Sequence, residues 1–218
     1  MHDLAKNILK DGIVKLGGFL SKNQVSSLKE EILDKIKKYA EEGYQFGKSL
    51  NFAPVDKMVH SETEIYKIFN TDFVKDLTQE YLGDNYLHAV QATHDYIANK
   101  DLARNGFLHF DRFHTLKFFV YLTDCDEKCG PFSCIKGTRH LGAQLRGRSW
   151  DQSGNYDKVK NRIEIDYPYL NITKKQAKPM IGSAGDLLIF DSDVFHYGGI
   201  ITEGSERVVL RLHYMKNS

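Results

Sequence analysis

The spacing of apolar residues changes near residue 84, and this change limits the fold more than any other feature of the sequence. Before it, a helical face follows an N-cap at Ser21 and repeats every three or four positions, through Val25, Leu28, Ile32, Ile36 and Tyr39. A second helical stretch covers about 62–82, with a break and a new cap at Asn70–Thr71–Asp72. After it, short strand-like runs follow one another. The sequence therefore predicts a helical N-terminal third on an antiparallel β-core.

The chain reads as a single domain over residues 1–218. Its 218 residues and 41% hydrophobic content suit one ordinary globular core, and 12 tyrosines and 13 phenylalanines are typical of β-sandwiches and barrels. We expect the helical part at about 1–83 and the β-core at about 84–216. Residues 140–180 are polar and contain several glycines, so we expect an irregular insertion that could serve a binding site.

Charge and cysteine content exclude several classes of function. The formal net charge is +1, which gives no electrostatic case for nucleic acid or for an anionic membrane surface. No apolar run approaches the roughly 18 residues of a membrane span, and the first residues have no long apolar signal segment. The cysteines Cys125, Cys129 and Cys134 are odd in number and lack zinc-finger spacing, so we expect free thiols and a cytoplasmic protein.

The heptapeptide "FLHFDRF" at 107–113 reads as a strand that carries an imidazole and a carboxylate. Side chains alternate along a strand, so His109 and Asp111 would share one face and Phe110 would take the other. A metal bound there needs a third ligand, and His196 in "FDSDVFHYGG" is the candidate. Two histidines and one carboxylate form the facial triad of non-haem Fe(II) oxygenases, which leaves three coordination positions open.

Two arginines near the C-terminus are candidates to bind a carboxylate. Arg207 lies eleven residues after His196, at the start of the last expected strand. Arginine holds a carboxylate through two parallel hydrogen bonds, as a dicarboxylate co-substrate chelating iron would require. Strand alternation places Arg211 on the same face. Arg211 is either a structural arginine paired with an aspartate, a cation that binds an acidic substrate, or the arginine that binds the co-substrate carboxylate in place of Arg207. For this last role the spacing from His196 favours Arg207.

The ordered set His-x-Asp, a distal histidine and an arginine eleven residues later resembles the phytanoyl-CoA dioxygenase family of 2-oxoglutarate-dependent Fe(II) oxygenases. The resemblance covers nearly the whole chain. Four segments carry it: "LKDGIVKLGGFLSKNQVSSLKEEI", "CGPFSCIKGTRHLG", "AGDLLIFDSDVFHYGG" and "ERVVLRLHYM". It implies a double-stranded β-helix, a jelly-roll barrel with helices packed on one side.

The resemblance also implies a cofactor and a reaction. Fe(II) would be bound by His109, Asp111 and His196, and 2-oxoglutarate would be a co-substrate with O₂. A small molecule would be hydroxylated, with release of succinate and CO₂. Related halogenases replace the carboxylate ligand with a small residue. Asp111 is present here, which favours hydroxylation or a related oxidation.

Further co-substrate contacts follow from the same resemblance. Arg207 would bind the distal carboxylate of 2-oxoglutarate, with Gln91 on the strand before His-x-Asp and Tyr121 on the strand after it. Lys117 is a rival to Tyr121. The family frequently has serine two positions after the distal histidine, where this chain has Gly198, so one hydrogen bond to the co-substrate is missing or comes from elsewhere.

Two other functions remain open at this point. One is a cupin-like metalloenzyme that does not use 2-oxoglutarate, and the other is a jelly-roll binding module without catalysis. The sequence predicts a polar or anionic small molecule as the substrate and specifies it no further. The support is a group of cations at the insertion, beside Trp150: Arg139, His140, Arg146 and Arg148. His94 and His114, which flank the metal segment, are expected to be surface or structural residues.

Overall fold

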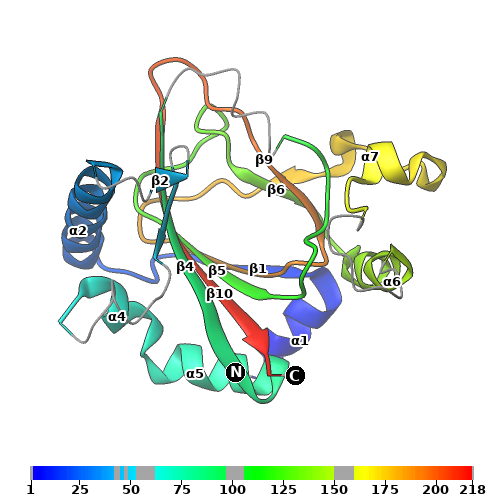
Figure 1. The fold of residues 1–218 in the computed structure, drawn as a ribbon, viewed down its shortest axis with the longest axis horizontal. Helices are drawn as coiled ribbons and strands as arrows, with labels where there is room; N and C mark the ends of the chain where they lie inside the picture. Colours follow the sequence, from blue (N-terminus) through cyan, green and yellow to red (C-terminus); the bar gives the residue numbers. More distant parts are fainter. Residues whose placement is uncertain are drawn as a thin grey trace.

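Two antiparallel sheets face each other in the computed structural model, which describes residues 2–41, 45–46, 49–52, 62–96, 106–149 and 160–217 (Figure 1). The larger sheet has the strand order β1-β8-β5-β10-β4-β3-β2, and the smaller one has the order β7-β6-β9. The strands are β1 (Ile13–Leu16), β2 (Gln45–Phe46), β3 (Ser49–Phe52), β4 (Asn85–Tyr96), β5 (Leu116–Tyr121), β6 (Phe132–Ile135), β7 (Lys178–Pro179), β8 (Leu187–Asp191), β9 (Phe195–Gly198) and β10 (Glu206–Lys216). This is the jelly-roll arrangement that the resemblance implies.

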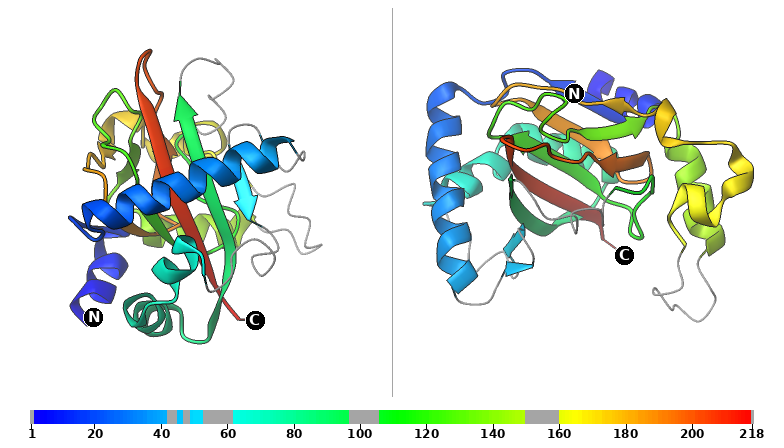
Figure 2. Two further views of the ribbon diagram at one scale, coloured as in Figure 1. Left: turned by 90° about the vertical axis from the view of Figure 1, so that its left-hand side faces the viewer. Right: turned by 90° about the horizontal axis from the view of Figure 1, so that it is seen from above.

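Helices cover the outside of the larger sheet. Figure 2 shows α2 running across β4 and β10, and α4 and α5 lie below the same sheet in Figure 1. The helical segments are α1 (His2–Asp11), α2 (Lys22–Glu41), α4 (Glu64–Phe69), α5 (Asp72–Leu82), α6 (Arg139–Ser149), α7 (Ile163–Asp166), η3 (Pro168–Leu170) and η4 (Lys174–Gln176). No helix among the described residues is long and apolar enough to cross a membrane.

The expected helix caps are present. The Gln24 backbone N–H donates to Ser21 Oγ at 3.4 Å, and the Gln24 side chain accepts from the Ser21 backbone in return. Thr71 caps α5 by accepting from the Val74 N–H, so the expected break between α4 and α5 is confirmed. These bonds satisfy backbone donors that a helix start leaves without partners.

Strand β10 separates the outer core from the barrel interior. Val208, Leu210 and Leu212 belong to the apolar cluster that the helices cover, whereas Val209 packs with Phe119 in a second cluster that also contains side chains of the smaller sheet. Because side chains alternate, the residues that share the face of Val209 project between the two sheets. These residues are Arg207, Arg211 and His213.

Three local expectations differ from the structure. Residues 107–113 form no continuous strand, since His109 makes only isolated bridges to Arg162 and His196. The start of the expected irregular insertion is helical, because α6 covers 139–149. Helix α1 and the strand pair β2–β3 were not expected from the sequence.

Candidate metal centre

The structure brings His109, Asp111 and His196 together. Their ligand atoms lie within 4.8 Å of one another. Asp111 Oδ1 is 3.9 Å from His109 Nε2 and 3.7 Å from His196 Nε2. The backbones of the two histidines exchange hydrogen bonds, His109 N–H to His196 O at 2.9 Å and His196 N–H to His109 O at 2.7 Å. This reciprocal pair fixes the distal histidine beside the His-x-Asp segment.

The side chains of residues 107–113 still alternate between two sides, although the segment forms no continuous strand. Phe110 points away from His109 and Asp111, is fully buried, and packs against Phe195 and Tyr167. The Asp111 N–H donates to Ser192 O at 3.0 Å, and the Asn161 side chain donates to Phe110 O. Apolar anchoring on one side therefore turns the imidazole and the carboxylate to the other side.

Each histidine is held in the tautomer that suits a metal ligand. His109 Nδ1 lies 2.6 Å from Phe107 O, and His196 Nδ1 lies 2.7 Å from Val194 O. A backbone carbonyl only accepts hydrogen bonds, so each Nδ1 carries the proton and each Nε2 presents a lone pair. Such backbone partners orient metal-binding imidazoles.

The electrostatics favour a charged carboxylate and a neutral imidazole. Burial works to raise the pKa of Asp111, but the Lys117 ammonium, 2.5 Å from Asp111 Oδ2, and the two histidines outweigh it and hold that pKa well below its ordinary value. Burial, and then the neighbouring His109, lower the pKa of His196 to about 3. At neutral pH Asp111 is thus charged and His196 neutral, the forms in which both can bind a cation. Oδ1 of Asp111 faces the imidazoles while Lys117 holds Oδ2.

A cavity of about 410 Å³ opens beside these residues. Besides His109 and Asp111, its lining consists of His88, Phe107, Arg112, Phe113, Thr115, Lys117, Asn161, Arg162 and His213. Among the described residues, the lining includes the cations Arg112, Lys117 and Arg162, and its single carboxylate is Asp111. Sequence reasoning named Lys117 only as a co-substrate contact, and it missed Thr115, His88 and His213. Alternation on β5 and β10 was the signal that could have found Lys117 and His213 together, since the two lie opposite each other.

The predicted co-substrate residues lie on the inner wall of the larger sheet, but Arg207 already has a carboxylate partner. Its Nη2 is 2.8 Å and its Nε 3.3 Å from Asp95 Oδ2, and Nη1 contacts Gly130 O. The Tyr121 hydroxyl donates to Met180 O at 2.8 Å. The Gln91 amide makes no hydrogen bond with any residue that the structure describes, and Gln91 is the register partner of Arg211.

Arg211 differs from the structural alternative considered from the sequence. Its Nη2 donates to Thr93 Oγ1 at 3.3 Å and its guanidinium lies 4.8 Å from the centre of the Phe119 ring. Its Nε is buried without a hydrogen-bond partner among the described residues. The aspartate pairing that was weighed for Arg211 is found at Arg207 instead.

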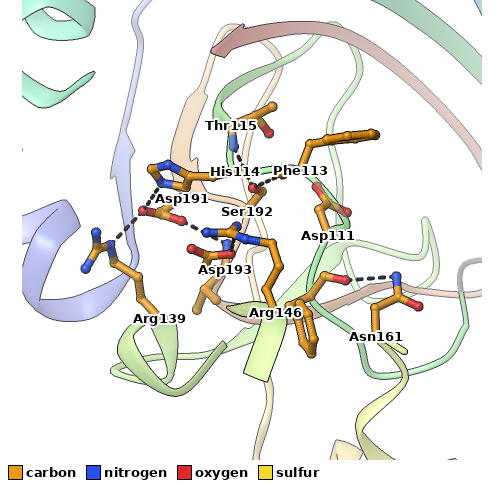
Figure 3. A network of polar contacts seen from close by, with 12 residues as sticks. Asp111, Phe113, His114, Thr115, Arg139, Arg146, Asn161, Asp191, Ser192 and Asp193 are labelled. Carbon is orange, nitrogen blue, oxygen red and sulfur yellow. Dashed lines mark hydrogen bonds and ion pairs between the residues drawn. The ribbon is translucent and has the colours of Figure 1, made fainter. Parts of the chain in front are cut away.

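A second group of potential ligands, His114, Asp191 and Asp193, is filled by the protein's own cations (Figure 3). His114 Nε2 and Arg139 Nε lie 2.9 Å and 2.6 Å from Asp191 Oδ2, and Arg146 Nη1 contacts Asp193 Oδ1. This network ties α6 to the end of β8 and to the turn that leads into β9, the strand that carries His196. Arg139 and Arg146 therefore act in structure here, and Trp150 lies outside the described residues.

Other expectations are met. His94 pairs with Glu206 at the surface, and His114 is part of the network just described. All three cysteines are free thiols.

Comparisons with known proteins agree with this geometry. A family model described as Phytanoyl-CoA dioxygenase (PhyH) matches residues 8–209. No curated protein matches the sequence. Among solved structures, the epimerase SnoN in complex with Fe3+, alpha ketoglutarate and nogalamycin RO has a TM-score of 0.68 at 16% identity, with 99% of this chain and 83% of that chain covered.

Two further structures have the same fold. EctD from S. alaskensis, with 2-oxoglutarate and 5-hydroxyectoine, has a TM-score of 0.69 at 14% identity, over 99% of this chain and 76% of that chain. HygX from Streptomyces hygroscopicus, with nickel and 2-oxoglutarate bound, has a TM-score of 0.63 at 12% identity, over 100% of this chain and 87% of that chain.

Proposed function

Because the chain belongs to the phytanoyl-CoA dioxygenase family of Fe(II)/2-oxoglutarate-dependent oxygenases, we propose that His109, Asp111 and His196 bind the iron with which it hydroxylates a small molecule. One observation carries this proposal. The Nε2 atoms of His109 and His196 lie close to Asp111 Oδ1, and a backbone carbonyl orients each imidazole through its Nδ1 atom. Membership of this family leaves no support for the inert binding module or for a cupin-like enzyme without 2-oxoglutarate.

The donor set fits a facially bound ferrous ion. The ligands are two imidazoles and one carboxylate, and they leave the remaining positions free for small ligands. Iron, 2-oxoglutarate and O₂ supply the oxidising chemistry, which releases succinate and CO₂. The chain contributes position and shelter. Lys117 holds Asp111 Oδ2, so that Oδ1 alone faces the metal position, and the buried ring of Phe110 closes the side away from the cavity.

The inner wall formed by β4, β5 and β10 is the proposed place for 2-oxoglutarate. Gln91 lies on this wall, and its amide makes no hydrogen bond with the described residues, whereas the Tyr121 hydroxyl donates to Met180 O. The spacing from His196 and the resemblance to the family both nominate Arg207 for the distal carboxylate. Its ion pair with Asp95 is the specific observation that brings Arg211 forward as a second candidate.

We propose a polar, anionic small molecule as the substrate. The support is the charge of the cavity wall: Arg112, Lys117 and Arg162 line the cavity, whereas its carboxylate, Asp111, is taken up by the metal. Arg112 and Arg162 are exposed, and exposed cations attract anions over a distance set by the salt concentration. The three free thiols suit a reducing compartment, which supports a cytoplasmic location.

Anaerobic titration tests the metal assignment. Purified protein is loaded with Fe(II) under nitrogen, and 2-oxoglutarate is added while the weak visible metal-to-ligand charge-transfer band is followed. We expect the band in the wild type and in His94→Ala, a matched control because His94 pairs with Glu206 away from the cavity. We expect no band in His109→Ala. A full band in His109→Ala would remove the assignment.

A screen for succinate release tests the substrate proposal. Carboxylated or phosphorylated metabolites are compared with neutral analogues of the same carbon skeleton. We expect turnover of the anionic members to fall as salt is raised. Faster turnover of the neutral members would contradict an anionic substrate.

A further inference from the structure

Residues 161–163 pair with the segment that carries the first two metal ligands. Arg162 forms an antiparallel bridge with His109. The Ile163 N–H donates to Leu108 O at 2.8 Å, which holds the two segments together. Residues directly opposite each other in such a pair project to the same side. The backbone pairing therefore places the side chain of Arg162 beside that of His109, and both line the cavity.

The guanidinium of Arg162 lies over an aromatic ring. Its central carbon is 4.6 Å from the centre of the Phe107 ring, which belongs to the residue two positions before His109. Arg162 is exposed and makes no ion pair with any residue that the structure describes, and Asp166 accepts a hydrogen bond from its backbone N–H only. A guanidinium over a ring keeps its N–H groups, which point outward in its own plane, available to a carboxylate or a phosphate.

The order of the side chains along the metal segment separates an anion on Arg162 from the carboxylate ligand. Phe107 and Asp111 lie on opposite sides of His109 in the sequence, and the guanidinium of Arg162 lies at the Phe107 end. Repulsion between an anion bound there and Asp111 is weakened by this separation. Lys117, by contrast, is 2.5 Å from Asp111 Oδ2 and is engaged by the metal ligand.

An aromatic side chain stands at each end of the metal segment. Phe107 and Phe113 are 38% and 42% exposed, and both line the cavity. His109 and Asp111 lie between them in the sequence. An exposed ring at a cavity gains free energy when the hydrocarbon part of a ligand covers it. A molecule with both an anion and a hydrocarbon part therefore matches this wall better than an anion alone.

We propose that Arg162 binds an oxyanion of the substrate, a carboxylate or a phosphate, and that the hydrocarbon part of the same molecule packs against Phe113. The inference rests on the proposed function, because it takes the cavity beside the triad as the place where the substrate binds. It narrows the substrate class from a polar anion to an acid with an apolar part. Arg162 and Phe113 determine which small molecules bind there, and neither residue binds the metal.

Two ligands with the same carbon skeleton isolate the contact to the anion. 3-Phenylpropanoate carries a carboxylate where 3-phenylpropanamide carries a neutral amide. Both are titrated by calorimetry, at low salt and under nitrogen, into protein loaded with Fe(II) and 2-oxoglutarate. We expect the wild type to bind the acid about three- to tenfold more tightly than the amide, the range for a charge-assisted hydrogen bond at an exposed site. We expect Arg162→Gln to bind the two equally, and Phe113→Ala to lose affinity for both by the same factor.

Arg112→Gln is the matched variant, because Arg112 is also an exposed arginine that lines the cavity. We expect it to lose less of the preference for the acid than Arg162→Gln does. An equal or larger loss in Arg112→Gln would show a general effect of cavity charge and would overturn the assignment. Equal affinity of the wild type for acid and amide, or no binding of either, would also overturn it.

The same titrations into metal-free protein separate this inference from the proposed function. The contact to Arg162 needs no iron, so we expect the preference for the acid there too, and its absence would overturn the inference. A preference for the acid in a protein that gives no charge-transfer band with Fe(II) and 2-oxoglutarate would sink the proposed function and leave the anion site in place.

Discussion

Replacing Arg211 with methionine should leave the ligand-free protein at least as stable as the wild type. Burial is the main cause that lowers the pKa of the Arg211 guanidinium from its ordinary value to about 10. At about 1.4 kcal/mol per unit, the charged form is disfavoured by about 3 kcal/mol, an upper bound because the side chain is only partly buried. Methionine loses the Thr93 hydrogen bond and the contact with the Phe119 ring, about 1 kcal/mol each. The net change is a gain of up to about 1 kcal/mol.

Arg207→Met should act in the opposite direction. Its partner Asp95 is 2.8 Å away and both side chains are buried. Removal of one member of a buried ion pair costs about 3–5 kcal/mol, because the other charge stays in a site that disfavours it. Two arginines four positions apart on one strand are therefore expected to differ by at least about 3 kcal/mol.

Urea unfolding of the metal-free proteins, followed by far-ultraviolet circular dichroism at neutral pH, measures this difference. The linear dependence of the unfolding free energy on urea gives each stability, and equal slopes show that the unfolded states are comparable. A loss of more than 2 kcal/mol in Arg211→Met, similar to the loss in Arg207→Met, would refute the reasoning, because Arg211 would then be as well paired as Arg207.

Three further predictions concern neighbouring residues. Lys117→Met should weaken Fe(II) binding about 10-fold or more in a competition titration with a chelator, since Asp111 Oδ2 loses its partner; tighter binding would mean that the ammonium competes with the metal. The pKa of His213 lies well below 6.5 in the fold, so protons bind to the unfolded chain first and the wild type should lose stability as pH falls below about 6.5. Between pH 6.5 and 5.5 the unfolding free energy of His213→Gln, measured with urea, should fall by up to about 1.4 kcal/mol less per pH unit than that of the wild type. An equal dependence on pH in the two proteins would contradict the burial argument. Gly142→Ala should lower the thermal midpoint by several degrees, because its Cβ would collide with the backbone oxygen of Asp193. A midpoint equal to that of the wild type would contradict the close approach.

Local signals in the sequence predicted α2, α4, α5 and the shared face of His109 and Asp111. Ser21 and Thr71 are caps whose side-chain chemistry acts over three residues, so neighbouring letters suffice to recognise them. The shared side of His109 and Asp111 follows from alternation alone. It holds even where hydrogen bonding is too sparse to form a strand.

Long-range pairing was not readable in the same way. Asp95 and Arg207 are 112 residues apart, and nothing local marks their contact. The pairing depends on the register of β10 against β4, which the sequence does not specify. For the same reason the sequence allows an aspartate partner for Arg211, whereas the structure has that pairing at Arg207.

Helix α1 could have been predicted from the sequence, because Ala5 and Ile8 lie on one buried face at helical spacing.

The most direct test of the metal centre is an anomalous difference map at the iron edge, from crystals grown anaerobically with Fe(II) and 2-oxoglutarate. We expect a single strong peak at coordination distance from the Nε2 atoms of His109 and His196 and from Asp111 Oδ1. A peak between His114, Asp191 and Asp193, or a His196 ring turned away from the iron, would contradict the proposed site.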